Sequence, residues 1–477
     1  MTRQERGLQA DEAFGALPPP WPDEGLRANI RRSVLASDVS LVVIDDDPTG
    51  TQTVFNVPVL TTWDAQTLGQ ELAKGTPVFY ILTNSRARAT AEAIALAGEL
   101  GRNLAHASRA TGRRLSLASR SDSTLRGHFP EEVDALCEAM ELRPDGVLLV
   151  PYFREGGRFT ISDVHYVLEG QRLTPAAQTE FAKDPAFGYS HSDLRRWVEE
   201  KTGKRWRAQD VASVSLDLLR LQGPEAVTQM LCSLEGGRPA IVNAASDRDL
   251  EVLVWAILKA EAQGKRFVAR CAASYVKVRG GIPDRRLLTA REVLGEGAAA
   301  GAGLVLVGSY VPRTTRQLQH LLQMPGWKGV KLEAAELLDA GQQSAALSRA
   351  RRALDELLSA GCNAVVFTSR EPVTGSTRQQ ALEIGRQISG AVVDLVRTLP
   401  ARPRFLVAKG GITSSDVATG GLGVRRANVM GQIAPGVPVW RLGEESRYPG
   451  MAYVVFPGNV GTDDTLAEIA QALAGSR

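Results

Sequence analysis

Short apolar runs alternate with longer amphipathic stretches along this chain. In the first half, the runs span residues 41–44, 78–82, 115–118, 147–150 and 240–242, and each is followed by polar residues or by Gly and Pro. A second series spans residues 304–307, 364–367 and 405–408. Strands that alternate with helical patterns are typical of a mostly parallel sheet flanked by helices. The pattern therefore predicts an α/β protein.

The length of 477 residues is large for one hydrophobic core and indicates two domains. A segment rich in Gly and Ala, residues 295–303, separates the two series of runs. We therefore expect an N-terminal extension over residues 1–37, a first domain over 38–294 and a second over 295–477, each with a mostly parallel sheet flanked by helices. The stretch 154–209 shows no strand–helix rhythm and is interpreted as a lid or an oligomer contact.

Composition argues against several kinds of partner. The chain has 56 basic and 53 acidic residues and a net charge of +3, so the overall charge supports neither a nucleic-acid nor a membrane partner. The polar N-terminus lacks the apolar core of a signal peptide, and no apolar run approaches the length of a membrane span. We expect a cytoplasmic protein. Its cysteines, Cys137, Cys232, Cys271 and Cys362, form no C-x-x-C pair, which favours reduced thiols over a zinc site.

Three consecutive aspartates end the first apolar run. Asp45, Asp46 and Asp47 lead into a Pro-Thr-Gly turn that contains Thr49. Their mutual repulsion is relieved if cations, Arg partners or a hydroxyl-rich ligand engage the carboxylates. Ligands of open α/β sheets bind beyond the carboxyl ends of the strands. The turn is therefore interpreted as a ligand-binding edge; the alternative is a solvated turn whose Asp side chains only cap backbone groups.

Two further strand ends of the first half carry similar chemistry. Arg86 follows the run at 78–82, and a polar stretch ending at Pro130 follows the run at 115–118. Pro130 can open a helix, which places the preceding residues at a strand-to-helix turn. Guanidinium groups hold carboxylates through paired hydrogen bonds, while Asp, Ser and Thr bind hydroxyls. A shared site for a small polyhydroxy acid is predicted, with Asp122, Ser123, Thr124 and Arg126 as contacts and His165 as a further candidate. The alternative is that Ser and Thr cap helices and Arg pairs with Asp locally.

Glycines and hydroxyls replace the carboxylates at the strand ends of the second half. These turns carry Ser309, then Gly410, Gly411, Ile412 and Thr413, then Gly458 and Asn459. Glycine permits close backbone approach, and exposed amides at helix starts bind phosphate oxygens. Neither G-x-x-x-x-G-K-[ST] nor G-x-G-x-x-G occurs, and glycine turns are also ordinary connections between strand and helix. The turns therefore indicate a nucleotide site without a standard phosphate motif.

Together these residues resemble the four-carbon acid sugar kinases, a family that includes kinases of threonate, erythronate and 3-oxo-tetronate. The resemblance runs from residue 38 to the C-terminus and rests on Asp45 to Gly50, Asn84 to Arg86, Ser121 to Gly127, Gly157-Arg158 with His165, Gly410 to Thr413, and Pro457 to Gly461. The chain departs from the family pattern at Arg120, where Lys is common, at His128, where Asn is common, and at Phe456-Pro457, where Lys-Ser is common. Arg presents a planar fork where Lys presents a point charge, so these departures leave the identity of the acid open.

The resemblance implies a sugar-acid-binding first domain, an ATP-binding second domain and an active site in the cleft between them. It implies a kinase that uses ATP and Mg²⁺ to phosphorylate a hydroxyl of a short sugar acid such as threonate, erythronate or an oxo-tetronate. The catalytic candidates are Asp45, Asp46, Asp47 and Asp122, of which one orients or deprotonates the hydroxyl. The acid is expected to contact Thr49, Arg86, Ser123, Thr124, Arg126 and His165, with Arg86 and Arg126 on its carboxylate. ATP is expected at Ser309, Gly410, Gly411, Ile412, Thr413, Gly458 and Asn459. No metal ligands are assigned, and a homodimer is a working expectation.

Two other classes of function stay open at this point. A metal-dependent lyase or epimerase of hydroxy acids would hold its metal with the aspartates, although no His lies near them in the sequence. A non-catalytic sensor of sugar acids would use the same two lobes without turnover. Thermal protection separates the classes: Mg-ATP stabilises a kinase, metal alone a lyase and the acid alone a sensor.

Overall fold

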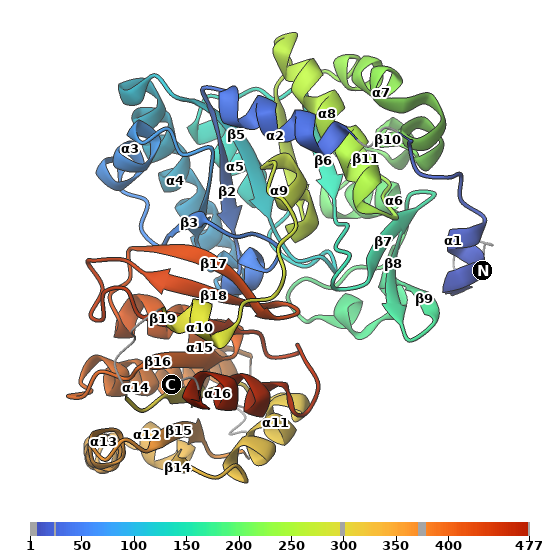
Figure 1. The fold of residues 1–477 in the computed structure, drawn as a ribbon. Helices are drawn as coiled ribbons and strands as arrows, with labels where there is room; N and C mark the ends of the chain where they lie inside the picture. The colour runs from blue at the N-terminus through green and yellow to red at the C-terminus, as the bar shows by residue number, and fades with distance from the viewer. Residues whose placement is uncertain (1–6, 23–24, 296–300, 371–377, 476–477) are drawn as a thin grey trace. The chain divides into compact units, whose positions relative to one another are not determined.

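Contacts between residues divide the chain into two units, each of which contains a series of neighbouring strands (Figure 1). Unit 1 comprises Met1–Gly50 and Thr62–Asp284, and unit 2 comprises Thr51–Thr61 and Arg285–Arg477. The computed structural model describes residues 7–22, 25–295, 301–370 and 378–475.

The division differs from the one expected from the sequence in two places. Unit 2 begins at Arg285, before the expected boundary, because Val293 and Leu294 of α10 (Ala290–Leu294) are buried in the core of unit 2. Residues Thr51–Thr61 join unit 2 because β3 (Val57–Leu60) pairs with β17 of that unit. Part of the Gly- and Ala-rich segment expected to separate the domains, residues 296–300, lies outside the described residues.

A parallel sheet forms the centre of unit 1, with the strand order β10-β11-β6-β12-β5-β2-β4. Its strands are β2 (Val39–Asp45), β4 (Val78–Leu82), β5 (Arg114–Arg120), β6 (Gly146–Val150), β10 (Ala212–Val214), β11 (Arg238–Val242) and β12 (Phe267–Cys271). Strands covered on both faces read as continuous apolar runs, which is why five of these were predicted correctly. Two strands were not predicted: β10, and β12, whose short apolar run is interrupted by Arg270.

Helices cover both faces of this sheet (Figure 1). One group in mutual contact consists of α3 (Ala65–Ala73), α4 (Thr90–Thr111) and α5 (Glu131–Ala139). The other consists of α2 (Leu26–Ala36), α7 (Gly223–Cys232), α8 (Asp247–Ala262) and α9 (Ala273–Arg279). As predicted, α5 begins directly after Pro130, and Val133, Leu136 and Cys137 are buried at helical spacing.

The stretch without a predicted rhythm forms a small antiparallel sheet and a helix. The sheet has the order β1-β9-β8-β7 and contains β1 (Leu8–Gln9), β7 (Arg158–Ile161), β8 (Val164–Glu169) and β9 (Arg172–Pro175). Helix α6 (Leu194–Lys201) follows. Strand β1 comes from the N-terminal extension, and Phe14 of α1 (Ala10–Gly15) packs edge-on against Phe159 with ring centroids 4.9 Å apart. The described part of the extension is therefore built into unit 1.

The sheet of unit 2 has the order β3-β17-β18-β19-β16-β13-β15-β14. From β19 to β14 it is parallel, with β19 (Ala452–Phe456), β16 (Phe405–Lys409), β13 (Leu304–Val307), β15 (Asn363–Thr368) and β14 (Trp327–Leu332). The other end is antiparallel and contains β3, β17 (Arg426–Ala434) and β18 (Val437–Leu442). Strands β13, β15 and β16 were predicted from the sequence, whereas β14, β19 and this antiparallel end were not.

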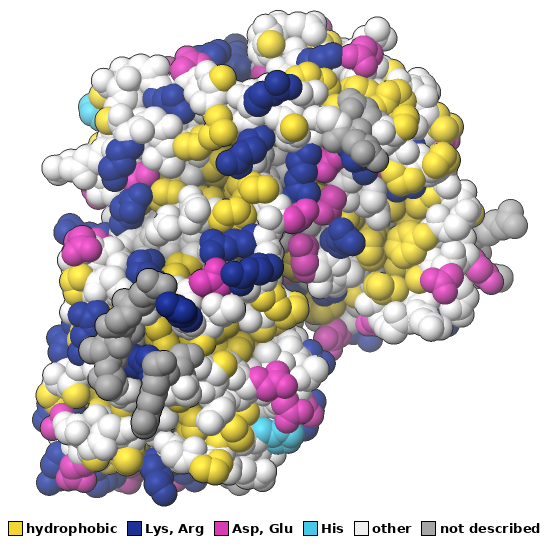
Figure 2. Space-filling view, viewed as in Figure 1, with side chains coloured by type: hydrophobic (Ala, Val, Ile, Leu, Met, Phe, Trp, Pro, Cys, Tyr) yellow, Lys and Arg dark blue, Asp and Glu magenta, His cyan; other side chains and the backbone are white. Residues whose placement is uncertain are grey.

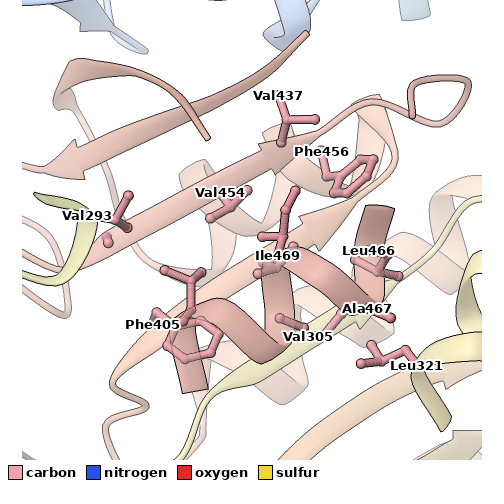
Figure 3. Packing of buried hydrophobic residues seen from close by; sticks show 14 of the residues in the cluster. Val293, Val305, Leu321, Phe405, Val437, Val454, Phe456, Leu466, Ala467 and Ile469 are labelled. Carbon is pink, nitrogen blue, oxygen red and sulfur yellow. The ribbon is translucent and has the colours of Figure 1, made fainter. Parts of the chain in front are cut away.

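Helices of unit 2 include α11 (Pro312–Leu322), α12 (Ala334–Leu338), α13 (Gln343–Ser359), α14 (Arg378–Arg397), α15 (Gly411–Asp416) and α16 (Thr465–Gly475). Figure 3 shows part of the core, in which Val305, Phe405 and Val454 of the strands lie close to Leu466 and Ile469 of α16. This packing fixes the strand ends from which the second predicted site is built.

The surface charges and the cysteines bear on whether the protein has a nucleic-acid partner, a membrane span or a disulfide. On the face shown in Figure 2, Lys and Arg side chains are spread out and often lie beside Asp and Glu. Within the described ranges, no helix is both long enough and apolar enough to cross a membrane. All four cysteines are free, and Cys137 and Cys271 are buried.

Candidate active site

The polar turns of unit 1 meet because their strands are neighbours in the sheet. In register, Asp45 stands beside Leu82 on one side and Arg120 on the other, and Arg120 stands beside Cys271. The turns that follow β2, β4, β5 and β12 therefore share one edge. The structure thus brings together the aspartate turn, Arg86 and the Asp122 to Arg126 turn.

The first aspartate is enclosed by protein. Asp45 Oδ1 accepts a hydrogen bond from Arg120 Nη1 at 3.0 Å, and only 2% of its side chain is exposed. Burial raises the pKa of Asp45 to about 7, although the charge of Arg120 opposes the shift. With so little exposed surface, Asp45 supports the turn from within, and its catalytic assignment stays a prediction without a visible route to substrate.

The second aspartate belongs to a hydrogen-bonded cluster. Asp46 Oδ2 accepts from Ser121 Oγ at 2.6 Å and from Arg86 Nε at 3.1 Å. The guanidinium of Arg86 also lies 3.5 Å from Asp47 and 3.7 Å from Asp122. Arg86 therefore bridges three carboxylates of the protein and relieves their repulsion, the Arg-partner arrangement foreseen for this cluster.

Asp47 and Asp122 are the more accessible carboxylates, with 23% and 12% of their side chains exposed. Burial alone would raise both pKa values, but Arg86 together with Arg120 lowers the pKa of Asp47. Arg86 and Arg126 likewise hold the pKa of Asp122 far below its usual range. Both groups are therefore ionised at neutral pH and can accept a hydrogen bond from a substrate hydroxyl.

Two arginines share one aromatic ring beside these carboxylates. The guanidinium carbons of Arg126 and Arg158 lie 5.2 Å and 5.5 Å from the ring centroid of Phe181. Arg126 also donates to Asp122 at 2.8 Å and lies 3.5 Å from Asp184. The Nε atom of Arg158 is buried and, among the described residues, has no hydrogen-bond partner. Two guanidiniums beside one ring, one of them with an unpaired N–H, favour an anion nearby.

His165 supports the Asp122 to Arg126 turn from behind. Its Nε2 lies 2.7 Å from Ser123 O, its Nδ1 lies 3.0 Å from Thr160 Oγ1, and its side chain is fully buried. Burial lowers the pKa of His165 to about 4, so the ring is neutral. Both ring nitrogens thus have protein partners, and the expected contact of His165 with substrate stays a prediction.

The remaining predicted contacts of unit 1 differ in access. Thr49 and Ser123 are partly exposed, whereas Thr124 is buried and its hydroxyl donates to Asp122. Tyr189 Oη donates to Thr124 O at 2.9 Å and holds the same turn. Thr49 Oγ1 donates to Asp47 Oδ1 at 2.5 Å, so Ser123 is the partly exposed hydroxyl that we regard as available to a ligand.

Sequence reasoning missed Arg270, which anchors this turn from β12. Its Nη2 donates to Arg126 O at 2.9 Å, and its guanidinium lies 5.1 Å from the ring centroid of Trp197. Arg158 was part of a quoted motif but received no role. An Arg inside or beside a short apolar run is the signal that could have identified both.

The predicted nucleotide turns also converge, because β13, β16 and β19 are adjacent strands. A β-carbon placed on Gly308 would lie 2.1 Å from Thr413 Oγ1, one on Gly410 would lie 3.2 Å from Ser309 Cβ, and one on Gly458 would lie 3.1 Å from Ser309 Oγ. Gly410 also has a positive φ of 122° that disfavours other residues. The three turns therefore lie so close together that larger residues would not fit at these glycines, and we call the surface that they form the glycine cradle.

The surroundings of this cradle suit a nucleotide. Ile412 is 57% exposed and offers an apolar surface of the kind that an aromatic base covers. Arg370 Nη2 donates to Ser309 O at 2.6 Å, while its buried Nη1 has no partner among the described residues. Backbone free of side chains, together with nearby cationic groups, fits a phosphate chain. Arg370 was not anticipated from the sequence.

The described residues hold no group of three or more His, Cys, Asp or Glu side chains placed to ligate a metal. Mg²⁺ that accompanies a nucleotide is bound mainly by phosphate oxygens and water, with one or two protein carboxylates. The chain is compatible with that mode of binding. In unit 1, Asp47 and Asp122 are the accessible carboxylates that could ligate the ion.

Three characterised kinases are similar to this chain. D-threonate kinase of Cupriavidus necator is 25% identical over 463 residues, which covers 92% of this chain and 99% of the relative. The 3-oxo-tetronate kinase of Pectobacterium atrosepticum is 24% identical over 74% of this chain and 79% of its own length. D-erythronate kinase of Heliobacterium modesticaldum is 33% identical over 37% of each chain.

Solved structures show the same fold. A crystal structure from Salmonella typhimurium superposes with a TM-score of 0.67 at 19% identity and covers 91% of this chain and 99% of its own. A second, from Haemophilus influenzae, gives a TM-score of 0.61 at 20% identity and covers 91% of this chain and all of its own.

Family models agree with the division of chemistry between the two units. The sugar-binding N-terminal domain matches residues 41–279, and the nucleotide-binding C-terminal domain matches residues 304–466. With carboxylates and guanidiniums in the first region and a glycine cradle in the second, the chain belongs to the four-carbon acid sugar kinase family.

Proposed function

We propose that this protein is an ATP-dependent kinase that phosphorylates a hydroxyl of a short sugar acid, most naturally one with four carbons. The observation that carries the proposal is the pairing of two kinds of strand-end site in one chain. One site presents ionised carboxylates beside guanidiniums, as a polyhydroxy acid requires, and the other presents a glycine cradle, as phosphates require.

Arg126 and Arg158 hold the carboxylate of the acid in this proposal. Their guanidiniums stand on the same ring, and Arg158 Nε is buried without a described partner. An acid bound there would relieve the repulsion between the two cations. Arg86, expected from the sequence to share this task, is engaged by Asp46, Asp47 and Asp122 and instead orients those carboxylates.

Asp47 and Asp122 place the reacting hydroxyl. A carboxylate that accepts its hydrogen bond aligns the oxygen for attack on the γ-phosphorus and receives the proton as the new P–O bond forms and the bond to ADP breaks. The low pKa values make both groups weak bases. Their main contribution is therefore orientation, with proton transfer late in the step.

The nucleotide lies on the cradle of unit 2. Ser309, Gly410, Gly411, Thr413, Gly458 and Asn459 approach the phosphates, and Ile412 contacts the base. Mg²⁺ bound together with the nucleotide would neutralise charge on the phosphate oxygens. Since phosphoryl transfer demands positioning more than covalent chemistry, rigid turns of this kind can supply much of the catalysis.

The proposal is tested by ADP release from the purified protein with Mg-ATP and a panel of four-carbon acids: both threonates, both erythronates and their 2-oxo and 3-oxo forms. Release that depends on one acid supports the kinase and identifies its substrate. Asp122→Asn is the matched control, since it should remove release while ATP still protects the protein from thermal unfolding. Absence of ATP binding to the wild-type protein would contradict the proposal.

The structure weakens the argument for a lyase. That alternative relied on three aspartates converging on a metal, but Asp45 is paired with Arg120 and Asp46 with Arg86. Thermal protection by a divalent metal alone, without nucleotide, would favour the lyase. Protection by an acid with no ADP release in the presence of Mg-ATP would favour the sensor.

A further inference from the structure

Lys409 is a buried lysine at the end of β16, directly before the Gly410 turn. Its side chain has no exposed surface. Its Nζ donates to Pro457 O at 2.6 Å and to Gly458 O at 3.2 Å, and lies 3.8 Å from the ring centroid of Phe456. The amine is thus fixed beneath the loop that follows β19.

This lysine lacks a negatively charged neighbour. Of the Asp and Glu side chains that the structure describes, none has an oxygen within 4.0 Å of Nζ. A buried cation without a counter-charge is strongly disfavoured. The charged form of this amine therefore lacks a counter-charge within the described protein.

The loop after β19 has its carbonyl groups tied back to the protein. Besides the contacts of Lys409, Thr314 Oγ1 donates to Gly458 O at 3.2 Å and Arg313 Nη1 donates to Asn459 O at 2.7 Å. Gln317 Nε2 donates to Val460 O at 3.1 Å and to Thr462 O at 2.6 Å. Four successive carbonyls, from Pro457 to Val460, therefore accept bonds from β16 and α11.

In a planar trans peptide the N–H points away from the C=O of the same unit. The amides of residues 458–461 consequently point away from Lys409, Arg313 and Gln317. Within the described part of the chain, no backbone or side-chain acceptor is found for these four amides. Successive unpaired amides form a concave anion site.

We propose that Lys409 is a positioning residue of the nucleotide site: it orients the amides of residues 458–461 toward the phosphates, and the phosphates supply its missing counter-charge. The inference rests on the proposed function, since it needs a bound nucleotide. Beyond the proposed function, the binding of phosphates is coupled to the charge of the buried Lys409 amine.

The coupling predicts proton uptake. Burial, reinforced by the charge of Arg313, lowers the pKa of Lys409 to about 6, so the amine is neutral at pH 7 to 8 without ligand. A phosphate anion restores a higher pKa, and the amine then takes up a proton.

Other titratable groups on the neighbouring elements are Arg313, Arg316 and His320 on α11, Asp416 on α15, Tyr453 on β19, Arg370 after β15, and Asp463, Asp464 and Glu468 near the start of α16. Asp463 is already paired with Arg316, and Asp464 with His320.

Calorimetric titration of the full-length protein with ADP, in buffers of different ionisation enthalpy, measures the protons taken up on binding. At a pH of about 7.5 the β-phosphate of ADP is mostly ionised, because such groups have a pKa near 6. The wild-type protein should take up about one proton more per ADP than Lys409→Arg, which keeps the donors but does not titrate. Equal uptake by the two proteins would overturn the proposal.

Two further measurements keep the test decisive. In the wild-type protein alone, ADP affinity should weaken nearly tenfold per pH unit between about pH 7 and 8.5, as one linked proton requires; an affinity independent of pH overturns the proposal even if no variant folds. Lys409→Met should bind ADP at least tenfold more weakly, whereas Lys328→Met, at an exposed lysine on β14, should bind it normally. If wild-type protein binds neither ADP nor ATP at any pH, the proposed function itself fails.

Discussion

Gly50 lies directly against the carboxylate of Asp45: a β-carbon at position 50 would stand 1.9 Å from Asp45 Oδ2. Glycine is required there by space, because no other residue leaves the carboxylate room to face Arg120. The contact closes the aspartate turn over its first carboxylate, so that Asp47 becomes the more exposed member. A glycine in the Pro-Thr-Gly turn thus selects which aspartate can meet a ligand.

Replacing this glycine should destabilise unit 1. Gly50→Ala forces the turn or the Asp45–Arg120 pair to move, and such overpacking costs about 1–3 kcal/mol of unfolding free energy. Urea unfolding measures the change. Gly69→Ala is the control, since its β-carbon would meet no atom within 4 Å in α3 and should raise stability by about 0.5–1 kcal/mol. Unchanged stability of Gly50→Ala would show that the turn is not closely packed.

Loss of the Asp122 carboxylate should affect turnover more than binding. We expect Asp122→Asn to lower kcat by about 10²- to 10⁴-fold, because the amide orients the hydroxyl less well and cannot receive its proton late in the step. The KM for ATP should change little. Steady-state kinetics with Asp47→Asn in parallel shows which carboxylate serves the hydroxyl, and normal turnover of Asp122→Asn would exclude Asp122 from that role.

Arg158 should determine affinity for the acid. Arg158→Lys keeps the charge but loses the planar fork, so the KM for the acid should rise at least tenfold while kcat and the KM for ATP stay similar. Arg154→Lys is a matched control, because the Arg154 side chain is 68% exposed on the neighbouring turn. An acid KM that is the same in both variants would remove Arg158 from the binding site.

His165 should make stability depend on acidity. Its pKa in the folded protein is about 4, below the usual 6.5, so the unfolded chain binds more protons below pH 6.5. The resulting stabilisation is complete above that pH and is lost as the pH falls toward 4. At about 1.4 kcal/mol per unit, it should decrease by about 2 kcal/mol between pH 6.5 and 5.

Urea unfolding at both pH values tests this loss. His165→Gln should show a smaller pH dependence than the wild-type protein, because glutamine does not titrate. His106→Gln, at an exposed position on α4, should leave the dependence unchanged. An identical pH dependence in His165→Gln would contradict the buried, neutral state of this ring.

The sequence by itself determined where strands end and which chemistry stands there. Asp45 and the residues around Arg126 follow apolar runs that can only be buried strands, and neighbouring parallel strands bring their ends to one edge. The same reasoning separated the carboxylate half from the glycine half. It did not predict β12, because Arg270 interrupts the apolar run, and it also did not predict β10, β14, β19 or the antiparallel β17 and β18.

Only the tertiary structure decided how the side chains at those ends are used. The spacing of Asp45, Asp46 and Asp47 gives no sign that Gly50 covers the first or that Arg86 bridges the others. Arg126 and Arg158 come from separate elements and both lie beside Phe181. Lys409 is buried by a loop about fifty residues further along the chain. Access, desolvation and pairing depend on contacts distant in sequence, so they are set by packing rather than by local pattern.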